Sequence, residues 1–207
     1  MKIALIGGTG FVGSKLLAEA LSRGHQVTVL VRDPLKVALD ENVIALPVDV
    51  HDTPALVVAI EGHAAVLSAY NPALPRGLEG ARSIIAAVKL ANVPRLFCVG
   101  GAGSLLRPDG TRVLDAHDFP THFRQGALNT AEFLLMLREE PTLDWTMLSP
   151  AEILSPGTRI GHFRLGDDHV LVDESGQSRI SVEDYAVAFL DELDSPRHSR
   201  ARFSVAY

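Results

Sequence analysis

The sequence predicts an α/β protein with a doubly wound parallel sheet, and three observations support this fold class. Short runs of β-branched and apolar residues alternate with segments of helical periodicity, which is typical of βαβ units. Several of these runs are apolar throughout, as expected for strands that helices cover on both faces. The chain has 207 residues, of which 47% are hydrophobic, so it can bury one large core and has little room for a second. We therefore expect one domain over residues 1–207.

The alternation predicts an ordered series of strands and helices. The strands are expected at residues 2–6, 26–31, 43–46, 64–67, 95–99, 145–148 and 202–206. The helices are expected at residues 11–23, 54–60, 77–90, 124–138 and 182–193. Gly24 is placed to end the first helix, because glycine readily takes the left-handed conformation that closes a helix. Ser181 and Asp184 suit the start of the last helix, where a hydroxyl caps free amides and a carboxylate meets the positive end of the helix dipole.

Two segments lack a regular pattern. Residues 100–121 form a long Gly-, Pro- and Asp-rich loop, and a compact domain keeps such a loop chiefly for function. We expect this loop to form one wall of a substrate pocket. Residues 155–178 carry turn residues around short apolar runs, which predicts a hairpin or a small lobe on the substrate side of the sheet.

Composition and charge exclude several classes of partner. The formal net charge of −6 argues against non-specific adhesion to nucleic acid or to an anionic membrane. Cys98 is the single cysteine and cannot form an intramolecular disulfide, and no stretch is apolar enough to span a membrane. His117 and His122 lack the spacing of a zinc site, so no metal is expected. We expect a cytoplasmic monomer or homodimer.

A glycine-rich turn lies between the first predicted strand and the first predicted helix. Gly7 permits a tight turn, Gly10 lets backbone amides approach a pyrophosphate, and Gly13 allows close packing of helix on sheet. The start of the helix then favours the anion. In this context the turn predicts dinucleotide binding by a Rossmann-type domain; the alternative is a flavodoxin-like turn that binds another phosphate.

The residue at the end of the second predicted strand bears on the choice of dinucleotide. A protein that prefers NAD usually has an acidic residue here to bind the ribose 2′-hydroxyl, whereas this chain has Arg32, 19 residues after Gly13. A guanidinium binds a 2′-phosphate through charge-assisted hydrogen bonds worth roughly 1.5 to 3 kcal/mol. NADP(H) is therefore preferred. NAD(H) remains possible if Arg32 pairs with Asp33, or if Asp33 itself binds the ribose.

Further motifs carry a family resemblance over nearly the whole chain. They are the glycine turn and residues 31–34, 99–105, 144–146, 149–150 and 179–186. With these motifs the chain resembles the atypical, extended-type short-chain dehydrogenase/reductase superfamily, in particular the NADH-flavin reductases related to NmrA-like proteins and to flavin/biliverdin-IXβ reductases. The resemblance implies a Rossmann-type doubly wound parallel sheet with helices on both faces and a small C-terminal substrate-side lobe.

The resemblance also implies further cofactor contacts. Thr9, Phe11 and Val12 would contact phosphate, Asp49 and Val50 would border the adenine, Ser68 and Ala69 would lie along the cofactor, and Ser149, Pro150 and Ala151 would frame the nicotinamide. Each strand-end serine also has an ordinary structural explanation, because serine often caps the end of a strand locally.

The superfamily's usual catalytic pair is missing from this sequence. That pair is a tyrosine followed four residues later by a lysine, which lowers the pKa of the phenol for proton transfer. Here Tyr70 is followed at that spacing by Leu74 and Tyr185 by Phe189, and Tyr207 is the last residue. Lysine-assisted oxidation of an alcohol is therefore not expected.

The remaining chemistry favours hydride transfer from NADPH to a flavin or another planar conjugated acceptor, with the flavin as a substrate rather than a tightly bound cofactor. A flavin is electrophilic and draws protons from solvent, so positioning would supply most of the catalysis. Ser104 is the best candidate to orient the acceptor, unless it only begins a turn, and Tyr70 could stack on the acceptor or hydrogen-bond to it. The alternatives are a non-catalytic NADP(H)-binding redox sensor of the NmrA-like type and, less favoured, a sugar-nucleotide epimerase or dehydratase.

Overall fold

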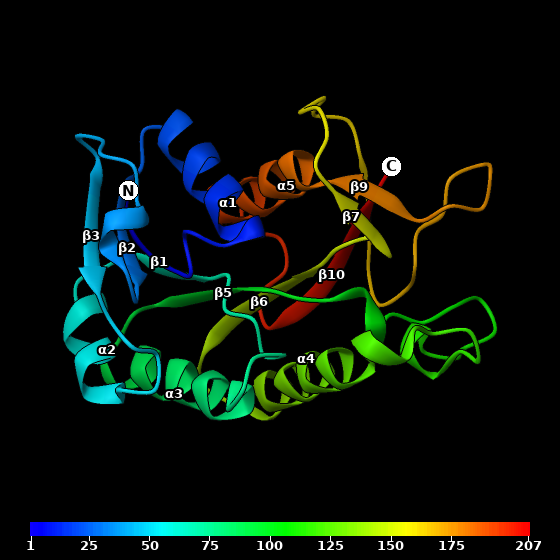
Figure 1. Cartoon of the computed structure of the whole chain (residues 1–207), viewed down its shortest axis with the longest axis horizontal. Helices are drawn as coiled ribbons and strands as arrows, with labels where there is room; N and C mark the ends of the chain where they lie inside the picture. The colour runs from blue at the N-terminus through cyan, green and yellow to red at the C-terminus, as the bar shows by residue number, and fades with distance from the viewer.

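A central sheet of eight strands runs through the molecule (Figure 1). The strands are β1 (Lys2–Ile6), β2 (Gln26–Val31), β3 (Val43–Pro47), β4 (Ala65–Ser68), β5 (Arg95–Val99), β6 (Asp144–Ser149), β8 (Arg164–Gly166) and β10 (Ala201–Ala206). This computed structural model describes residues 1–207. The strand order is β3-β2-β1-β4-β5-β6-β10-β8, and every neighbouring pair is parallel except β10 and β8. The order reverses between β1 and β4, which is the switch point of a doubly wound sheet.

Helices cover both faces of this sheet. They are α1 (Phe11–Ser22), α2 (Thr53–Ile60), α3 (Gly77–Leu90), α4 (Thr121–Glu139) and α5 (Val182–Asp194). Figure 1 shows α1 and α5 on one face and α2, α3 and α4 on the other. The predicted fold class, a Rossmann-type doubly wound parallel sheet, is confirmed. None of the helices combines the length and the apolar character that crossing a membrane requires.

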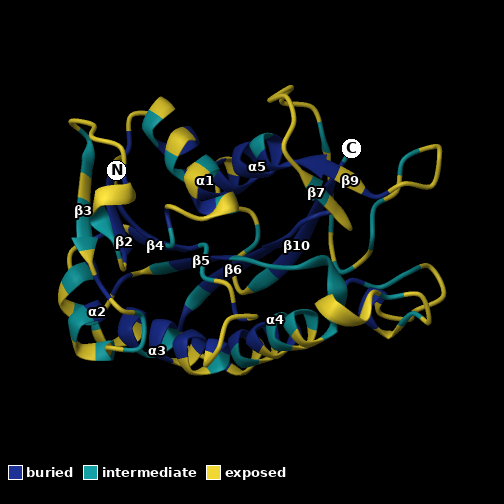
Figure 2. Cartoon of the chain, in the orientation of Figure 1, coloured by how far each residue is buried: buried dark blue, intermediate teal, exposed yellow.

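Alternate residues of the strands pack into two separate cores. In β1, Ile3 and Leu5 join the core beneath α1 and α5, whereas Ala4 and Ile6 join the core beneath α2, α3 and α4. The strands in the middle of the sheet are therefore buried on both sides (Figure 2). This burial is the physical reason that these strands are apolar without alternation.

The short elements were not predicted. Two three-residue strands, β7 (Ile153–Ser155) and β9 (Arg179–Ser181), pair in parallel as a separate small sheet. Between them, residues 155–178 form a small lobe whose strand β8 pairs with β10 of the main sheet, so no hairpin forms within the segment. Three residues are too few to show a period in the sequence, and these pairings depend on the tertiary structure.

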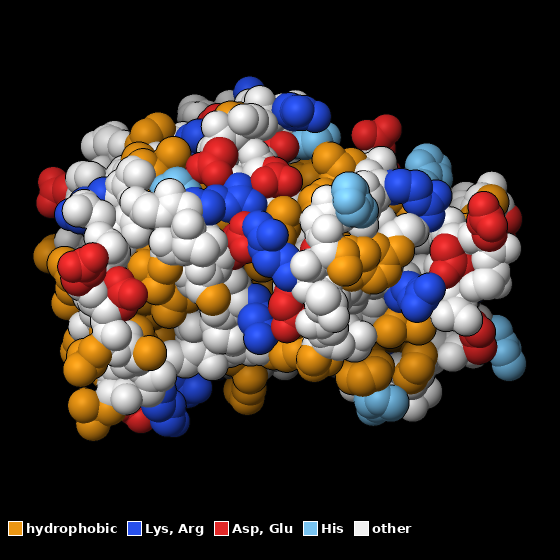
Figure 3. Space-filling view, turned by 90° about the horizontal axis from the view of Figure 1, so that it is seen from above, with side chains coloured by type: hydrophobic (Ala, Val, Ile, Leu, Met, Phe, Trp, Pro, Cys, Tyr) orange, Lys and Arg blue, Asp and Glu red, His pale blue; other side chains and the backbone are white.

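The small lobe is tied to the helices beside it. Arg159 in the lobe donates to the Glu19 carboxylate of α1 at 2.9 Å. The Asp184 carboxylate of α5 accepts from the amides of Ile160 and Gly161 at 3.0 and 2.8 Å. Acidic and basic side chains are interspersed over this face of the molecule (Figure 3). The lobe is therefore held against α1 and α5 by charged side chains.

The loop of residues 100–121 is anchored by local structure. It contains two short 3-10 helices, η2 (Ala102–Ser104) and η3 (Val113–Asp115). Leu105 and Leu114 of the loop are buried, and Leu106 forms a β-bridge with His169 of the small lobe. The loop therefore has a defined position at the carboxyl edge of the sheet.

Replacing Tyr185 tests how α5 is attached to this edge. Its buried hydroxyl donates to the Leu148 carbonyl at 2.7 Å, and the Gly100 amide donates to the same oxygen at 2.8 Å. Because Leu148 keeps Gly100 as a partner, Tyr185→Phe should lower the free energy of unfolding by only about 1 kcal/mol in urea denaturation. Tyr185→Ala should cost about 3 kcal/mol or more because it leaves a cavity. Equal losses for the two variants would contradict this description.

Candidate functional site

The turn between β1 and α1 has the close contacts that its glycines predict. Gly7 has a φ of 79°, in the left-handed region that favours glycine, and its carbonyl accepts from the Gly10 amide at 3.0 Å. A Cβ atom on Gly13 would overlap that carbonyl oxygen. The first helical hydrogen bond joins the Ser14 amide to the Gly10 carbonyl at 2.9 Å. The amides before it have no helical partner and give the start of α1 a partial positive charge.

A cavity of about 500 Å³, which we call the switch-point cavity, lies beside this turn. It opens where β1, β2 and β4 end, the usual ligand position in such sheets. Seven of the residues predicted to bind cofactor line it: Gly7, Thr9, Gly10, Arg32, Asp49, Val50 and Ala69. The structure thus brings together residues from four separate segments of the sequence.

Arg32 and Asp33 differ in their surroundings. Arg32 is exposed and forms no ion pair or hydrogen bond with any residue of the chain. The Asp33 carboxylate accepts from the Leu35 amide at 3.2 Å and lies 3.5 Å from the Lys36 ammonium. The pairing of Arg32 with Asp33, one of the alternatives from the sequence, does not occur.

Asp49, which lines the switch-point cavity, keeps a negative charge. Its carboxylate accepts from the His51 amide at 3.0 Å and contacts the His51 ring nitrogen Nδ1 at 2.8 Å. These hydrogen bonds, the one from the amide first, hold the pKa of Asp49 below its usual value. The carboxylate is therefore an ionised hydrogen-bond acceptor at neutral pH.

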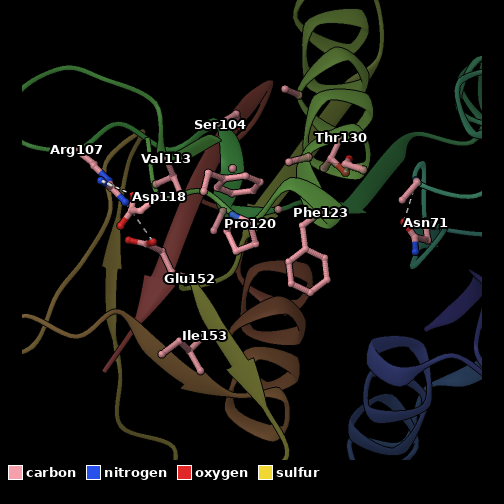
Figure 4. Close-up of a pocket in the computed structure, with 18 residues that line it drawn as sticks. Asn71, Ser104, Arg107, Val113, Asp118, Pro120, Phe123, Thr130, Glu152 and Ile153 are labelled. Atoms are coloured by element: carbon pink, nitrogen blue, oxygen red, sulfur yellow. Dashed lines mark hydrogen bonds and ion pairs between the residues drawn. The ribbon is translucent and has the colours of Figure 1, made fainter. Parts of the chain in front are cut away.

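A second cavity of about 560 Å³, which we call the loop cavity, lies between the loop and the start of α4 (Figure 4). Apolar side chains, including Phe119, Phe123 and Ile153, form much of its wall. At one end the Arg107 guanidinium lies 4.0 Å from Asp118 and 3.8 Å from Glu152. The loop of residues 100–121 supplies one wall of this cavity, and Ser104 lines it. Asn71 borders both cavities, so the two adjoin.

The other predicted cofactor residues lie around these cavities rather than on their walls. Phe11, Val12 and Gly13 form the first turn of α1. Ser68 is buried at the end of β4 with its hydroxyl unpaired, and Ser149, Pro150 and Ala151 are buried at and after the end of β6. Their contacts with a cofactor stay predictions.

Tyr70 lines the switch-point cavity and is absent from the wall of the loop cavity. Its hydroxyl is buried against Gly80 of α3 and has no hydrogen-bond partner. Burial raises the pKa of this phenol. In this conformation the ring is available for contact with a ligand, whereas the hydroxyl is covered.

Some residues line the cavities but lie outside the sequence motifs, and the sequence did not identify them. They are His51, Asn71, Leu74 and Pro75 at the switch-point cavity, and Arg107, Asp118, Phe119, Phe123 and Glu152 at the loop cavity. For Arg107, Asp118 and Phe119 the available signal was the length of the loop, which indicated a wall without indicating the side chains that line it. The other six residues lie outside the loop and gave no such signal.

The fold and the switch-point cavity define a dinucleotide-binding domain. The profile of the NAD(P)H-binding family matches residues 7–193, and the chain belongs to this family. It is 40% identical over 211 residues to the uncharacterized protein YwnB of Bacillus subtilis (strain 168), covering 99% of this chain and 98% of YwnB.

Solved structures agree with this assignment. A Bacteroides thetaiotaomicron protein named as a candidate epimerase aligns with a TM-score of 0.96 and 43% identity, covering 100% of this chain and 96% of that one. A protein from Streptococcus pneumoniae TIGR4 named as a candidate NADH-flavin reductase aligns with a TM-score of 0.84 and 32% identity, covering 100% and 99%. The family resemblance stated from the motifs is confirmed.

Gly13→Ala tests the contact between α1 and the turn. The added methyl group would meet the Gly7 carbonyl and push the start of α1 away, so the dissociation constant for NADPH should rise at least about tenfold, equivalent to about 1.4 kcal/mol. Isothermal titration calorimetry measures this change. Ser14→Ala is the matched control, because Ser14 is exposed on the same turn and its hydroxyl contacts only the Phe11 carbonyl. Unchanged affinity in Gly13→Ala would show that this contact does not shape the binding site.

Proposed function

We propose that the protein is an NADPH-dependent oxidoreductase that transfers hydride from NADPH to a flavin or another planar conjugated acceptor. The observation that carries the proposal is that Asn71 lines both cavities, so that they adjoin. A dinucleotide whose pyrophosphate lies at the glycine turn would place its adenosine near Asp49 and its nicotinamide toward Ser104. The loop cavity would then hold the acceptor against the nicotinamide.

The preference for NADPH is supported by the contrast between Arg32 and Asp33. Arg32 lines the switch-point cavity with all its donors uncommitted, so its guanidinium is available to a 2′-phosphate. Asp33 already accepts from the Leu35 amide and lies near Lys36, which makes it a poorer partner for a ribose hydroxyl. An extra phosphate is therefore favoured over the bare ribose.

The form of the loop cavity supports a planar, largely apolar acceptor. Its volume of about 560 Å³ lies within the usual range for small-molecule sites, and aromatic rings at Phe119 and Phe123 offer flat apolar surface. Hydride transfer to a conjugated ring depends mainly on holding the two rings together, so it does not require the missing tyrosine–lysine pair. The flavin would act as a substrate that binds and leaves.

A turnover assay tests the activity. Purified protein is mixed with NADPH and FMN, FAD or riboflavin without oxygen, and the absorbance of the reduced nicotinamide is followed. We expect the absorbance to fall with at least one acceptor and to remain constant without protein. Tight NADPH binding without turnover on any acceptor would contradict the proposal and support a non-catalytic redox sensor.

Arg32→Ala tests the choice of dinucleotide. Loss of the guanidinium should raise the dissociation constant for NADPH about tenfold to hundredfold and that for NADH by less than about twofold, because only NADPH carries the 2′-phosphate. Lys36→Ala is the control, since Lys36 is an exposed cation nearby that does not line the cavity. An equal loss of affinity for both dinucleotides in Arg32→Ala would sink the assignment.

A further inference from the structure

Arg202 of β10 lies directly behind Ser104, and its side chain is only 2% exposed. Its Nη1 donates to the hydroxyls of Ser104 and Ser149, both at 3.3 Å, and its Nη2 donates to the Ser104 carbonyl at 3.4 Å. Its Nε donates to the Asp168 carboxylate. One guanidinium therefore contacts the two serines that sequence and motif placed at the nicotinamide end of the site.

The charges around Arg202 leave an excess of positive charge beside Ser104. Arg138 donates to both oxygens of Asp168, at 3.0 and 3.1 Å, so this carboxylate is shared by two guanidinium groups. Burial lowers the pKa of Arg202, and Asp168 opposes that effect; a guanidinium nevertheless stays protonated in proteins. Arg202 is buried while Asp168 is half-exposed, and an ion pair of this kind contributes little net stability, so stability alone is a weak reason for this arrangement.

We propose that Arg202 is a positioning residue that orients and polarises the Ser104 hydroxyl. This role corresponds to that of the lysine beside the tyrosine in the superfamily's usual pair. Because Arg202 donates to the Ser104 oxygen, the proton of that hydroxyl is left for another acceptor, and no group of the chain takes it. Ser104 lines the loop cavity, so the free proton would be offered to a ligand there. This inference rests on the proposed function.

The role follows from where charge develops in the reaction. Hydride transfer breaks the C4–H bond of the reduced nicotinamide and forms a new bond to hydrogen on the acceptor, which takes up the electron pair. Negative charge then builds up on a conjugated oxygen or nitrogen of the acceptor until a proton from water neutralises it, and NADP⁺ leaves. A hydroxyl donor backed by a guanidinium stabilises that charge, as preorganised donors do in other active sites.

A purely structural role for Arg202 is the competing explanation. The segment that carries Asp168 also holds the loop, because the Leu106 amide donates to the Asp168 carbonyl at 2.8 Å and the Val170 amide donates to the Leu106 carbonyl at 2.9 Å. Loss of Arg202 could loosen this attachment and move the loop without any effect that passes through Ser104. The experiment must therefore separate the two roles.

A double-mutant cycle makes this separation. The turnover number is measured at saturating NADPH and flavin for wild type, Ser104→Ala, Arg202→Met and the double variant. Arg202→Met and Ser104→Ala should each lower it about tenfold to hundredfold, and the double variant should lie within about threefold of Ser104→Ala, because both changes remove the same effect. Arg202→Lys, which keeps a charge, should retain more activity than Arg202→Met. The KM for NADPH should change little.

Arg112→Met is the matched control, because Arg112 pairs with Asp115 in the same loop, is exposed, and contacts neither Ser104 nor Asp168. It should leave the turnover number within about twofold of wild type, as expected for an exposed ion pair. If the losses from Ser104→Ala and Arg202→Met multiply in the double variant, Arg202 acts on the fold, and this inference is wrong while the proposed function stands. If Arg202→Met does not fold, the cycle is run with Arg202→Lys. If the wild-type protein fails to oxidise NADPH with any of the three flavins, the proposed function and this role are both overturned.

Discussion

The reversal of strand order between β1 and β4 is the constraint on which the rest of the structure depends. Right-handed crossovers send α1 to one face of the sheet and α3 to the other, so the loops that follow β1 and β4 diverge. The space between them holds the glycine turn, Arg32 and Asp49 along one cavity. Close contact between Gly13 and Gly7 then fixes the start of α1 against this space. The topology of the sheet therefore determines where the residues of the site lie.

The same topology explains why most of the fold could be predicted. Strands buried on both faces must be apolar throughout, and helices that cover them must repeat at three to four residues, so both leave a strong pattern. The limits of β1, β2, β5 and α3 agree with the predicted limits, whereas α4 begins at Thr121, three residues before the expected start. The strands β7, β8 and β9 left no pattern, because each has three residues and its pairing depends on distant parts of the chain.

The candidate site likewise contains residues that the sequence could place and residues that it could not. Residues carried by a local motif, such as Gly7, Gly10 and Arg32, could be placed from the sequence because turn geometry and strand position determine their surroundings. Arg202 and Ser104 are 98 residues apart and meet only because β10 pairs with β6, so no local pattern could reveal their contact. The sequence also could not predict that the Tyr70 hydroxyl is covered, since its direction depends on the absence of a side chain at Gly80.

The position of Asn71 has a kinetic consequence. Because this residue borders both cavities, a nicotinamide that lies as proposed would form part of the surface on which the acceptor rests. The acceptor site is then incomplete in the empty protein and finished by the dinucleotide itself. Such an arrangement calls for a ternary complex in which the dinucleotide binds before the acceptor, giving a compulsory-order sequential mechanism and not a ping-pong one.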